Sequence, residues 1–287
     1  MSETTPRFGL TDKQQSELPT IYDADLFRGK VVLISGAGSG IGKAIAFLFS
    51  RLGAKLYICG RKLEKLETTI EMVESWGGEV HAKAMSIRDP EQINELMDDV
   101  WKTYGRLDIL VNNAGGQFPG LAIDFSLKGW KAVIDTNLNG TWYMMQAAAK
   151  QWRDHKQPGN IINITAAVSR GITGMAHTAA ARAGVNFLTK TVAVEWAPFN
   201  IRVNCVAPGA IESTGFYQYP QEFISNFYRA NPMLKAGSTH DIAQAVVYLA
   251  GDSGKFINGE VLNVDGGGSG WGEFWPSGQP EYFNVDT

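Results

Sequence analysis

The stretch that decides the fold is Ser35-Gly36-Ala37-Gly38-Ser39-Gly40-Ile41-Gly42, which lies between the apolar run 30–35 and the amphipathic pattern 42–52. Glycines in this place let backbone N–H groups and the start of a helix approach a pyrophosphate without obstruction by side chains. A merely flexible loop does not require this position between a strand and a helix. The spacing is Gly-x-x-x-Gly-x-Gly, because Ile41 stands where GxGxxG has its last glycine. We therefore expect a phosphate-binding turn.

Strands and helices alternate outward from this turn. Strand-like apolar runs lie at 30–35, 55–59, 80–85, 107–111, 160–164, 201–206 and 260–264, and helical patterns at 42–52, 63–76, 90–104, 129–152, 175–196 and 240–249. Parallel neighbouring strands need crossover connections, and crossover helices cover both faces of the sheet. The expected fold class is α/β, with a doubly wound, seven-stranded parallel sheet of Rossmann type in a single domain.

The chain has three expected parts. Residues 1–28 carry no hydrophobic period and are expected to form an N-terminal arm, residues 29–267 the dinucleotide-binding catalytic domain, and residues 268–287 a C-terminal tail. Ligands of doubly wound sheets lie beyond the carboxyl ends of the strands. The aromatic segment 212–235 leaves that edge without a clear period, so we expect it to form a lid.

Composition excludes several classes of protein. The 287 residues include 26 Lys and Arg and 29 Asp and Glu, a formal net charge of −3, so no nucleic-acid partner is expected. Cys59 and Cys205 stand far apart and the four histidines are scattered, so neither a disulfide scaffold nor a metal site is expected. No apolar run reaches membrane-spanning length and residues 1–18 are polar, which predicts no membrane partner and a location in the cytoplasm.

Several motifs, in order, resemble those of the short-chain dehydrogenase/reductase superfamily over nearly all of 30–267. They are the glycine turn, Asn112-Asn113-Ala114-Gly115, Asn137, Pro208-Gly209 and Val264-Asp265-Gly266-Gly267. The resemblance implies a nicotinamide cofactor. The residues implied to bind it are Gly36, Ser39, Gly40, Ile41, Gly42, Arg61, Asn113, Ala114, Gly115, Arg182, Pro208, Gly209, Ile211 and Ser213.

The end of the second strand favours NADP over NAD. An acidic residue about twenty residues beyond the glycines would bind the ribose hydroxyls of NAD. Here the stretch is Cys59-Gly60-Arg61-Lys62, which has no acid to repel a phosphate and a guanidinium to bind one. The alternative is that Arg61 is only a solvated residue at the start of the next helix.

The catalytic positions depart from the superfamily pattern, which has a Ser and a Tyr four residues before a Lys. Thr178 stands at the Tyr position and Arg182 at the Lys position, and Ala166 replaces the Ser with Thr165 beside it. The spacing of four puts Thr178 and Arg182 on one helix face. Ketone reduction needs an acid such as a phenol to protonate an alkoxide. Hydride addition to an enoyl thioester instead forms a less basic enolate, which hydroxyl, cationic and backbone donors can stabilise.

A closer resemblance supports this chemistry. The motifs around Asn112–Phe118, Thr136–Leu138 and His177–Val185 resemble the peroxisomal trans-2-enoyl-CoA reductase branch, which similarly carries a small hydroxyl residue and an Arg. The related 2,4-dienoyl-CoA reductases keep the Lys and have a Tyr on the preceding loop, whereas loop 166–176 contains no tyrosine here. His177 either carries a proton to the site or points away from Thr178 at the helix start.

Three functions remain open. The first is an NADPH-dependent reductase of an enoyl thioester with catalytic residues Asn137, Thr165, His177, Thr178 and Arg182, in which Asn137 and Arg182 position the nicotinamide ribose and nearby water. The second is a ketone or alcohol dehydrogenase on an apolar substrate, and the third is a catalytically degenerate NADP-binding protein. The resemblance also implies a homotetramer that pairs the helices 129–152 and 175–196.

Overall fold

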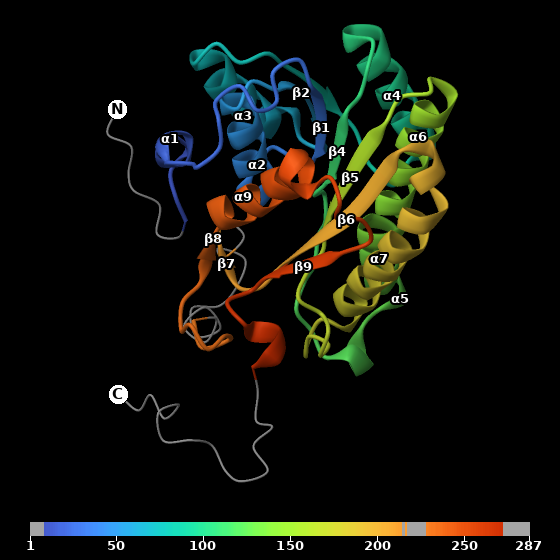
Figure 1. Ribbon diagram of the computed structural model, residues 1–287. Coiled ribbons are helices and arrows are strands. Elements are labelled where there is room, and N and C mark those ends of the chain that lie inside the picture. The colour runs from blue at the N-terminus through green and yellow to red at the C-terminus, as the bar shows by residue number, and fades with distance from the viewer. Residues whose placement is uncertain (1–8, 214–215, 217–227, 272–287) are drawn as a thin grey trace.

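A computed structural model describes residues 9–213, 216 and 228–271, and its centre is a seven-stranded sheet in the order β3-β2-β1-β4-β5-β6-β9 (Figure 1). All six strand pairs are parallel. The strands are β1 (Val31–Ser35), β2 (Lys55–Gly60), β3 (Val80–Ala84), β4 (Ile109–Asn112), β5 (Gly159–Ile164), β6 (Ile201–Pro208) and β9 (Val261–Val264). The expected α/β class and doubly wound parallel sheet are confirmed.

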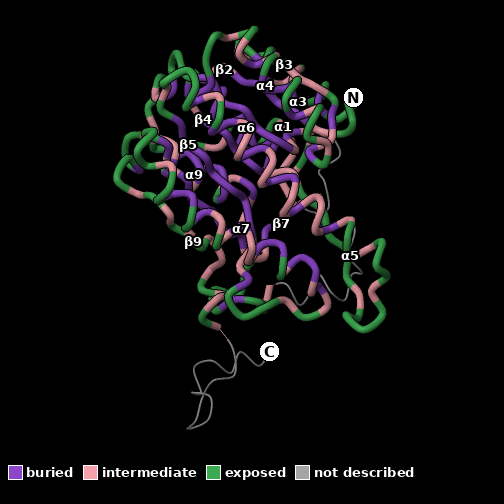
Figure 2. Tube along the Cα trace, turned by 90° about the vertical axis from the view of Figure 1, so that its right-hand side faces the viewer, coloured by how far each residue is buried: buried purple, intermediate pink, exposed green. Residues whose placement is uncertain are grey.

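Helices cover both faces of this sheet. One face packs on α2 (Gly40–Arg51), α3 (Leu63–Ser75) and α9 (Thr239–Ala250), and the other on α4 (Pro90–Tyr104), α6 (Gly140–Asp154) and α7 (Ala176–Glu195). Each face has its own apolar core, and the buried part of the chain runs through the middle of the molecule in Figure 2. Burial of these two apolar faces drives the assembly of the layers.

The helix expected over 129–152 is divided in the structure. Helix α5 (Leu127–Ile134) passes into a π-helical turn, η2 (Asp135–Asn139), before α6 begins. Asn137 lies in this turn with its side chain buried and bonded to a loop outside the helix. A π-turn admits one extra residue per turn, which a hydrophobic period does not reveal. The expectation of one continuous α-helix was therefore wrong.

The arm expected over 1–28 is described from residue 9 and contains a short helix, α1 (Asp12–Glu17). Thr11 caps this helix through a capping box with Gln14. Gln15 is buried, and Lys43 of α2 pairs with Asp12 at 2.8 Å. The arm is thus packed on α2.

A second, two-stranded parallel sheet joins β7 (Ile211–Glu212) to β8 (Gly237–Ser238). Its strands stand at the two ends of the segment that we expect to be a lid, 212–235. Residues 214–215 and 217–227 of that segment lie outside the described residues, as do tail residues 272–287. The proposed lid therefore has its two ends held together by backbone pairing.

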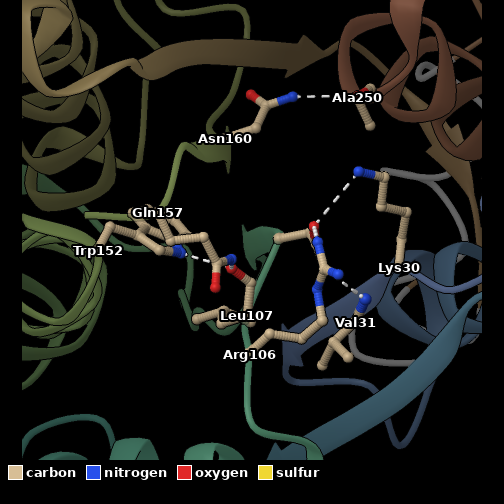
Figure 3. A network of polar contacts seen from close by, with 9 residues as sticks. Lys30, Val31, Arg106, Leu107, Trp152, Gln157, Asn160 and Ala250 are labelled. Carbon is tan, nitrogen blue, oxygen red and sulfur yellow. Dashed lines mark hydrogen bonds and ion pairs between the residues drawn. The ribbon is translucent and has the colours of Figure 1, made fainter. Parts of the chain in front are cut away.

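A polar network ties the sheet together around the residues that precede β1, β4 and β5 (Figure 3). The Asp108 carboxylate accepts from the Val31 backbone N–H at 2.9 Å and pairs with Lys30 and Arg106. Trp152 Nε1 donates to the Leu107 carbonyl at 2.6 Å. These bonds align strands and helices without belonging to the opposite, carboxyl edge of the sheet, where the candidate site lies.

Candidate active site

The glycine turn leaves the start of α2 open to an anion. Gly36 and Gly40 have φ of 70° and 54°, values that residues other than glycine rarely adopt. A Cβ on Gly42 would collide with the Gly36 carbonyl and the Asn113 amide. Ser39 is the N-cap residue of α2, yet its side chain makes no capping hydrogen bond. The backbone N–H groups of the first helical turn are therefore available to a phosphate.

Asn113 and Ser35 hold this turn in shape. Asn113 Nδ2 donates to the Ser35 and Gly36 carbonyls, both at 3.1 Å. Ser35 Oγ accepts from the N–H groups of Asn113 at 3.1 Å and Ala114 at 3.0 Å. Asn113, expected to bind the cofactor, thus braces the turn. Ser35 was missed as a site residue, although its place at the end of β1 was a usable signal.

The loop after β6 meets the glycine turn. Gly209 donates to the Val264 carbonyl at 3.0 Å, and a Cβ there would lie 2.7 Å from Asp265 Cα, so only glycine fits. Ile211 is buried in β7. A Cβ on Gly40 would lie 3.9 Å from Ser213 Cβ. The expected cofactor residues Pro208, Gly209, Ile211 and Ser213 therefore belong to one segment, which reaches the turn at Ser213.

Arg61 extends from the end of β2 with an exposed side chain. Lys62 and Lys65 are also exposed, and Lys65 Cβ lies against Gly38 of the glycine turn. No ion pair of Arg61 is found within the described ranges. Three cations therefore stand close together in the sequence at this end of the turn, one of which, Lys62, pairs with Glu64 at 4.0 Å.

Arg182 is a buried cation with no ion pair to any of the described residues. Its side chain is 8% exposed, and Nη1 has no hydrogen-bond partner among the described residues. Burial lowers the pKa of Arg182 to about 10. A Cβ on Gly115 would collide with Nη2 and lie 3.1 Å from Asn137 Oδ1, which brings Gly115, Asn137 and Arg182 together. Gly115 is exposed, so the guanidinium lies just beneath the surface.

Thr178 and His177 form a second cluster at the start of α7. His177 Nδ1 accepts from the Thr178 N–H at 2.7 Å and lies 3.3 Å from Thr178 Oγ1. The His177 ring is fully buried, stacks on Phe125 at 4.4 Å and meets the edge of Phe118 at 4.6 Å. The ring of His177 is therefore in contact with its neighbour in α7 and with two aromatic rings.

The protonation state of His177 follows from these contacts. Burial lowers the pKa of His177, which favours the neutral ring near pH 7. Because Nδ1 accepts a hydrogen bond, the neutral ring carries its proton on Nε2. Nε2 is buried and has no hydrogen-bond partner among the residues described. His177 thus caps the first turn of α7 and keeps one donor unused.

Asn137 and Thr165 have mainly structural contacts. Asn137 Oδ1 accepts from the Gly116 N–H, and Nδ2 donates to the Gly116 carbonyl, both at 2.9 Å. Its amide is therefore engaged by the loop after β4. Thr165 is buried and its Oγ1 lies 3.4 Å from the Val206 carbonyl. No contact joins Thr165 to Thr178 within the described part of the chain.

Within the described ranges, no tyrosine makes a hydrogen bond or ring contact with Thr178, His177 or Arg182. Tyr217, Tyr219 and Tyr282 lie outside these ranges. The described site therefore offers a hydroxyl, a neutral imidazole and a guanidinium, but no phenol. This set can stabilise a delocalised oxyanion.

A family model described as Enoyl-(Acyl carrier protein) reductase matches residues 36–269. The chain belongs to the short-chain dehydrogenase/reductase family. A relative of that family, a probable 2,4-dienoyl-CoA reductase of Bacillus subtilis, is 39% identical over 243 residues, which cover 83% of this chain and 96% of the relative. A 3-oxoacyl-[acyl-carrier-protein] reductase FabG of Thermotoga maritima is 36% identical over 83% of this chain and 97% of its own.

A solved structure of the short-chain dehydrogenase/reductase family gives the same fold. It is a citronellol catabolism dehydrogenase (AtuB) of Pseudomonas aeruginosa, with a TM-score of 0.79 and 34% identity over 88% of this chain and all of the other. Family membership implies a nicotinamide cofactor. The uncapped start of α2 and the unpartnered Nη1 of Arg182 fit such a group, because both offer donors to oxygen atoms and anions.

Two further results bear on partners and metals. None of the described helices combines the length and the apolar character needed to span a bilayer. No group of three or more His, Cys, Asp or Glu residues in the described ranges is arranged to hold a metal ion.

Proposed function

We propose that this protein is an NADPH-dependent reductase of the C=C bond of an acyl thioester, with a trans-2-enoyl-CoA-like compound as substrate. The observation that carries the proposal is Arg182, a buried guanidinium whose Nη1 lacks a partner in the described chain. A buried donor without a partner costs free energy, and a ligand oxygen that carries negative charge in the transition state would recover it.

The residues of the site suit an enolate better than an alkoxide. When bound, reduced nicotinamide supplies a hydride. Thr178 and Arg182 lie four residues apart on α7 and both are buried, so the proposal requires the substrate oxygen to reach this face of the helix. His177 Nδ1 accepts the Thr178 N–H at 2.7 Å and lies 3.3 Å from Thr178 Oγ1, so the hydroxyl has to turn away from the imidazole to bind the thioester oxygen. Arg182 keeps its charge at neutral pH and stabilises the enolate, while water protonates the α-carbon.

Asn137 acts in this scheme as a positioning residue. It bonds Gly116 at both amide atoms, and its Oδ1 lies near the Gly115 backbone that borders Arg182. The loop after β4 is thus fixed beside the guanidinium. The cofactor preference for NADP is supported by the exposed cations Arg61, Lys62 and Lys65 near the glycine turn. We also propose a homotetrameric assembly and a cytoplasmic location.

The names of the relatives support two neighbouring substrates. One relative is named a 2,4-dienoyl-CoA reductase, and reduction of a dienoyl thioester also passes through a delocalised anion. Another is named a 3-oxoacyl reductase, whose substrate is a ketone. A ketone would need a proton donor strong enough for an alkoxide, and Thr178 does not supply one. Conjugated thioesters are therefore the proposed class.

The test is NADPH oxidation with crotonyl-CoA, 2,4-hexadienoyl-CoA and acetoacetyl-CoA at equal concentrations. We expect turnover with a conjugated thioester and loss of about 100-fold or more in kcat/KM for Arg182→Met. Lys102→Met, a change at an exposed residue of α4, is the matched control and should keep full activity. Turnover of acetoacetyl-CoA alone would refute the proposal. No turnover with any substrate, despite NADPH binding, would favour a degenerate cofactor-binding protein.

A further inference from the structure

The N-terminal arm borders the glycine turn. A cavity of about 70 Å³ lies between the two, lined by Gly9, Leu10, Asp12, Gln15, Ser39, Gly40, Lys43, Glu212, Ser213 and Thr239. Four of these residues come from the arm and the others from the turn, α2, β7 with the residue after it, and α9. The cavity is too small for a dinucleotide but is comparable in size to two or three water molecules, which take about 30 Å³ each in liquid water. This space lies at the start of α2, where a phosphate is expected.

One end of the arm is fixed by a buried ion pair. Lys43 Nζ lies 2.8 Å from Asp12 Oδ2 and 3.0 Å from Thr68 Oγ1. The Lys43 side chain is only 10% exposed and that of Asp12 is 34% exposed. A lysine so covered needs an anionic partner, and the arm supplies it. The pair therefore attaches α1 to the helix that begins at the glycine turn.

The arm is also bonded to the base of the proposed lid. The Gly9 N–H donates to Glu212 Oε1 at 2.9 Å, and a Cβ on Gly9 would lie 3.3 Å from Ser213 Cα. Gln15 Oε1 accepts from Thr239 Oγ1 at 3.0 Å, which joins the arm to α9. Farther along, Arg51 donates to the Leu18 carbonyl at 2.8 Å. The arm thus spans the turn, the lid base and α9.

The arm does not occupy the place of the phosphate itself. No recorded hydrogen bond in the described ranges joins an arm residue to the N–H groups of Ser39, Gly40 or Ile41. The Asp12 carboxylate is directed to Lys43. The family match begins at residue 36, after the arm. These contacts therefore place the arm beside the phosphate position and not within it.

We propose that residues 9–17 are part of the cofactor site and form the outer wall of the pocket for the diphosphate of the nicotinamide dinucleotide. This inference rests on the part of the proposed function that concerns the dinucleotide, and it does not depend on the acyl substrate. With the wall in place, the diphosphate is shielded on the side of α9 and of β7. Release of the dinucleotide then requires the arm to leave its contacts with Lys43 and Glu212. The arm therefore lowers the dissociation rate of the cofactor.

The test variant removes the ion pair without leaving a net charge. We expect Asp12→Asn combined with Lys43→Met to raise the dissociation rate and the Kd of NADPH by about three- to ten-fold, with little change in association rate. The matched control is Lys55→Met with Glu79→Gln, which removes an ion pair of the same 2.8 Å length at the start of β2. Stopped-flow fluorescence and calorimetry measure the binding without any acyl substrate.

Amide hydrogen exchange gives a second readout on the unmodified protein. NADPH should slow exchange in residues 9–17, and the double variant should lose this protection. Unchanged NADPH kinetics in the double variant, or an equal effect of the control, would overturn the proposal. Tighter binding by the double variant would also overturn it, because the arm would then be a competitor. A wild-type protein that binds NADPH but reduces no enoyl thioester leaves the wall intact and refutes only the substrate class.

Discussion

The buried guanidinium of Arg182 destabilises the folded protein when no ligand is bound. The guanidinium is buried, and its Nη1 has no partner in the described chain. Burial lowers the pKa of Arg182 from its ordinary value to about 10, so the folded state holds the proton less tightly than the unfolded state does. Because arginine is a base, burial of its protonated form lowers the free energy of unfolding at every pH below about 10. The penalty fades as pH rises above about 10 toward the pKa of an unfolded arginine.

Arg182→Met is therefore expected to stabilise the ligand-free protein while it abolishes reduction. The apolar side chain removes the buried charge and should raise the free energy of unfolding by about 1–3 kcal/mol at pH 7. Urea denaturation without cofactor measures this change. Lys102→Met at an exposed residue of α4 is the control and should change stability by less than about 0.5 kcal/mol. A less stable Arg182→Met protein would mean that the guanidinium is satisfied within the fold.

The identities of Thr178 and Arg182 were predictable from their places in the motif, but their surroundings were not. The contact of Arg182 with Gly115 joins residues far apart in the chain, and the return of the His177 ring to Thr178 depends on a side-chain rotamer. A local sequence pattern predicts neither this contact nor the orientation of the His177 ring. Ser35 was missed for the same reason, because its partners Asn113 and Ala114 lie far along the chain, in the loop after β4.

At the scale of elements, local signals predict helix ends well and internal irregularities poorly. Helix α4 was expected over 90–104 and is found at Pro90–Tyr104, because Asp89 caps it and Gly105 ends it with φ of 70°. The π-turn Asp135–Asn139 was missed because its cause, the bonds of Asn137 to Gly116, is tertiary. Helix α1 was missed because six residues form a helix only when packed.

Asn137→Ala tests whether the π-turn positions the loop beside Arg182. Gly116 is exposed, so water replaces the lost bonds and stability should fall by only about 1 kcal/mol. Activity should fall more, by about 10- to 100-fold in kcat/KM, because the loop no longer holds its place. Asn139→Ala in the same turn removes a bond to Asp135 of 2.9 Å and is the control. Equal losses of activity in both variants would contradict a special role for Asn137.

At the scale of the whole molecule, the alternation of strand-like apolar runs with helical patterns was sufficient to predict the parallel sheet. Each strand expected between 30 and 264 has a counterpart in the structure, with ends shifted by a residue or two. The pair β7–β8 was not expected, because strands of two residues carry no period. The hand of the crossovers follows a general rule, whereas the packing of the arm on α2 and α9 depends on single polar contacts such as Asp12–Lys43.

The exposed face of α7 bears on the assembly of the protein. Phe187 and Val194 are 69% and 77% exposed, and their spacing of seven residues puts them on one face of the helix. An apolar helix face of this kind is typical of a subunit interface. The pairing of long helices expected from the family resemblance would cover it. We therefore expect light scattering to give a mass about four times the 31.3 kDa of one chain.

Phe187→Glu combined with Val194→Glu should shift this protein to smaller species, because each carboxylate would lose its hydration in the interface. Ile123→Glu is the matched control. Ile123 is 91% exposed but belongs to the turn η1 (Ala122–Asp124), so this variant should assemble as the wild type does. A wild-type monomer, or a mass of the α7 variant equal to that of the wild type, would exclude α7 as the interface. Because Arg182 lies on the same helix, dissociation should also reduce activity, which links assembly to the site.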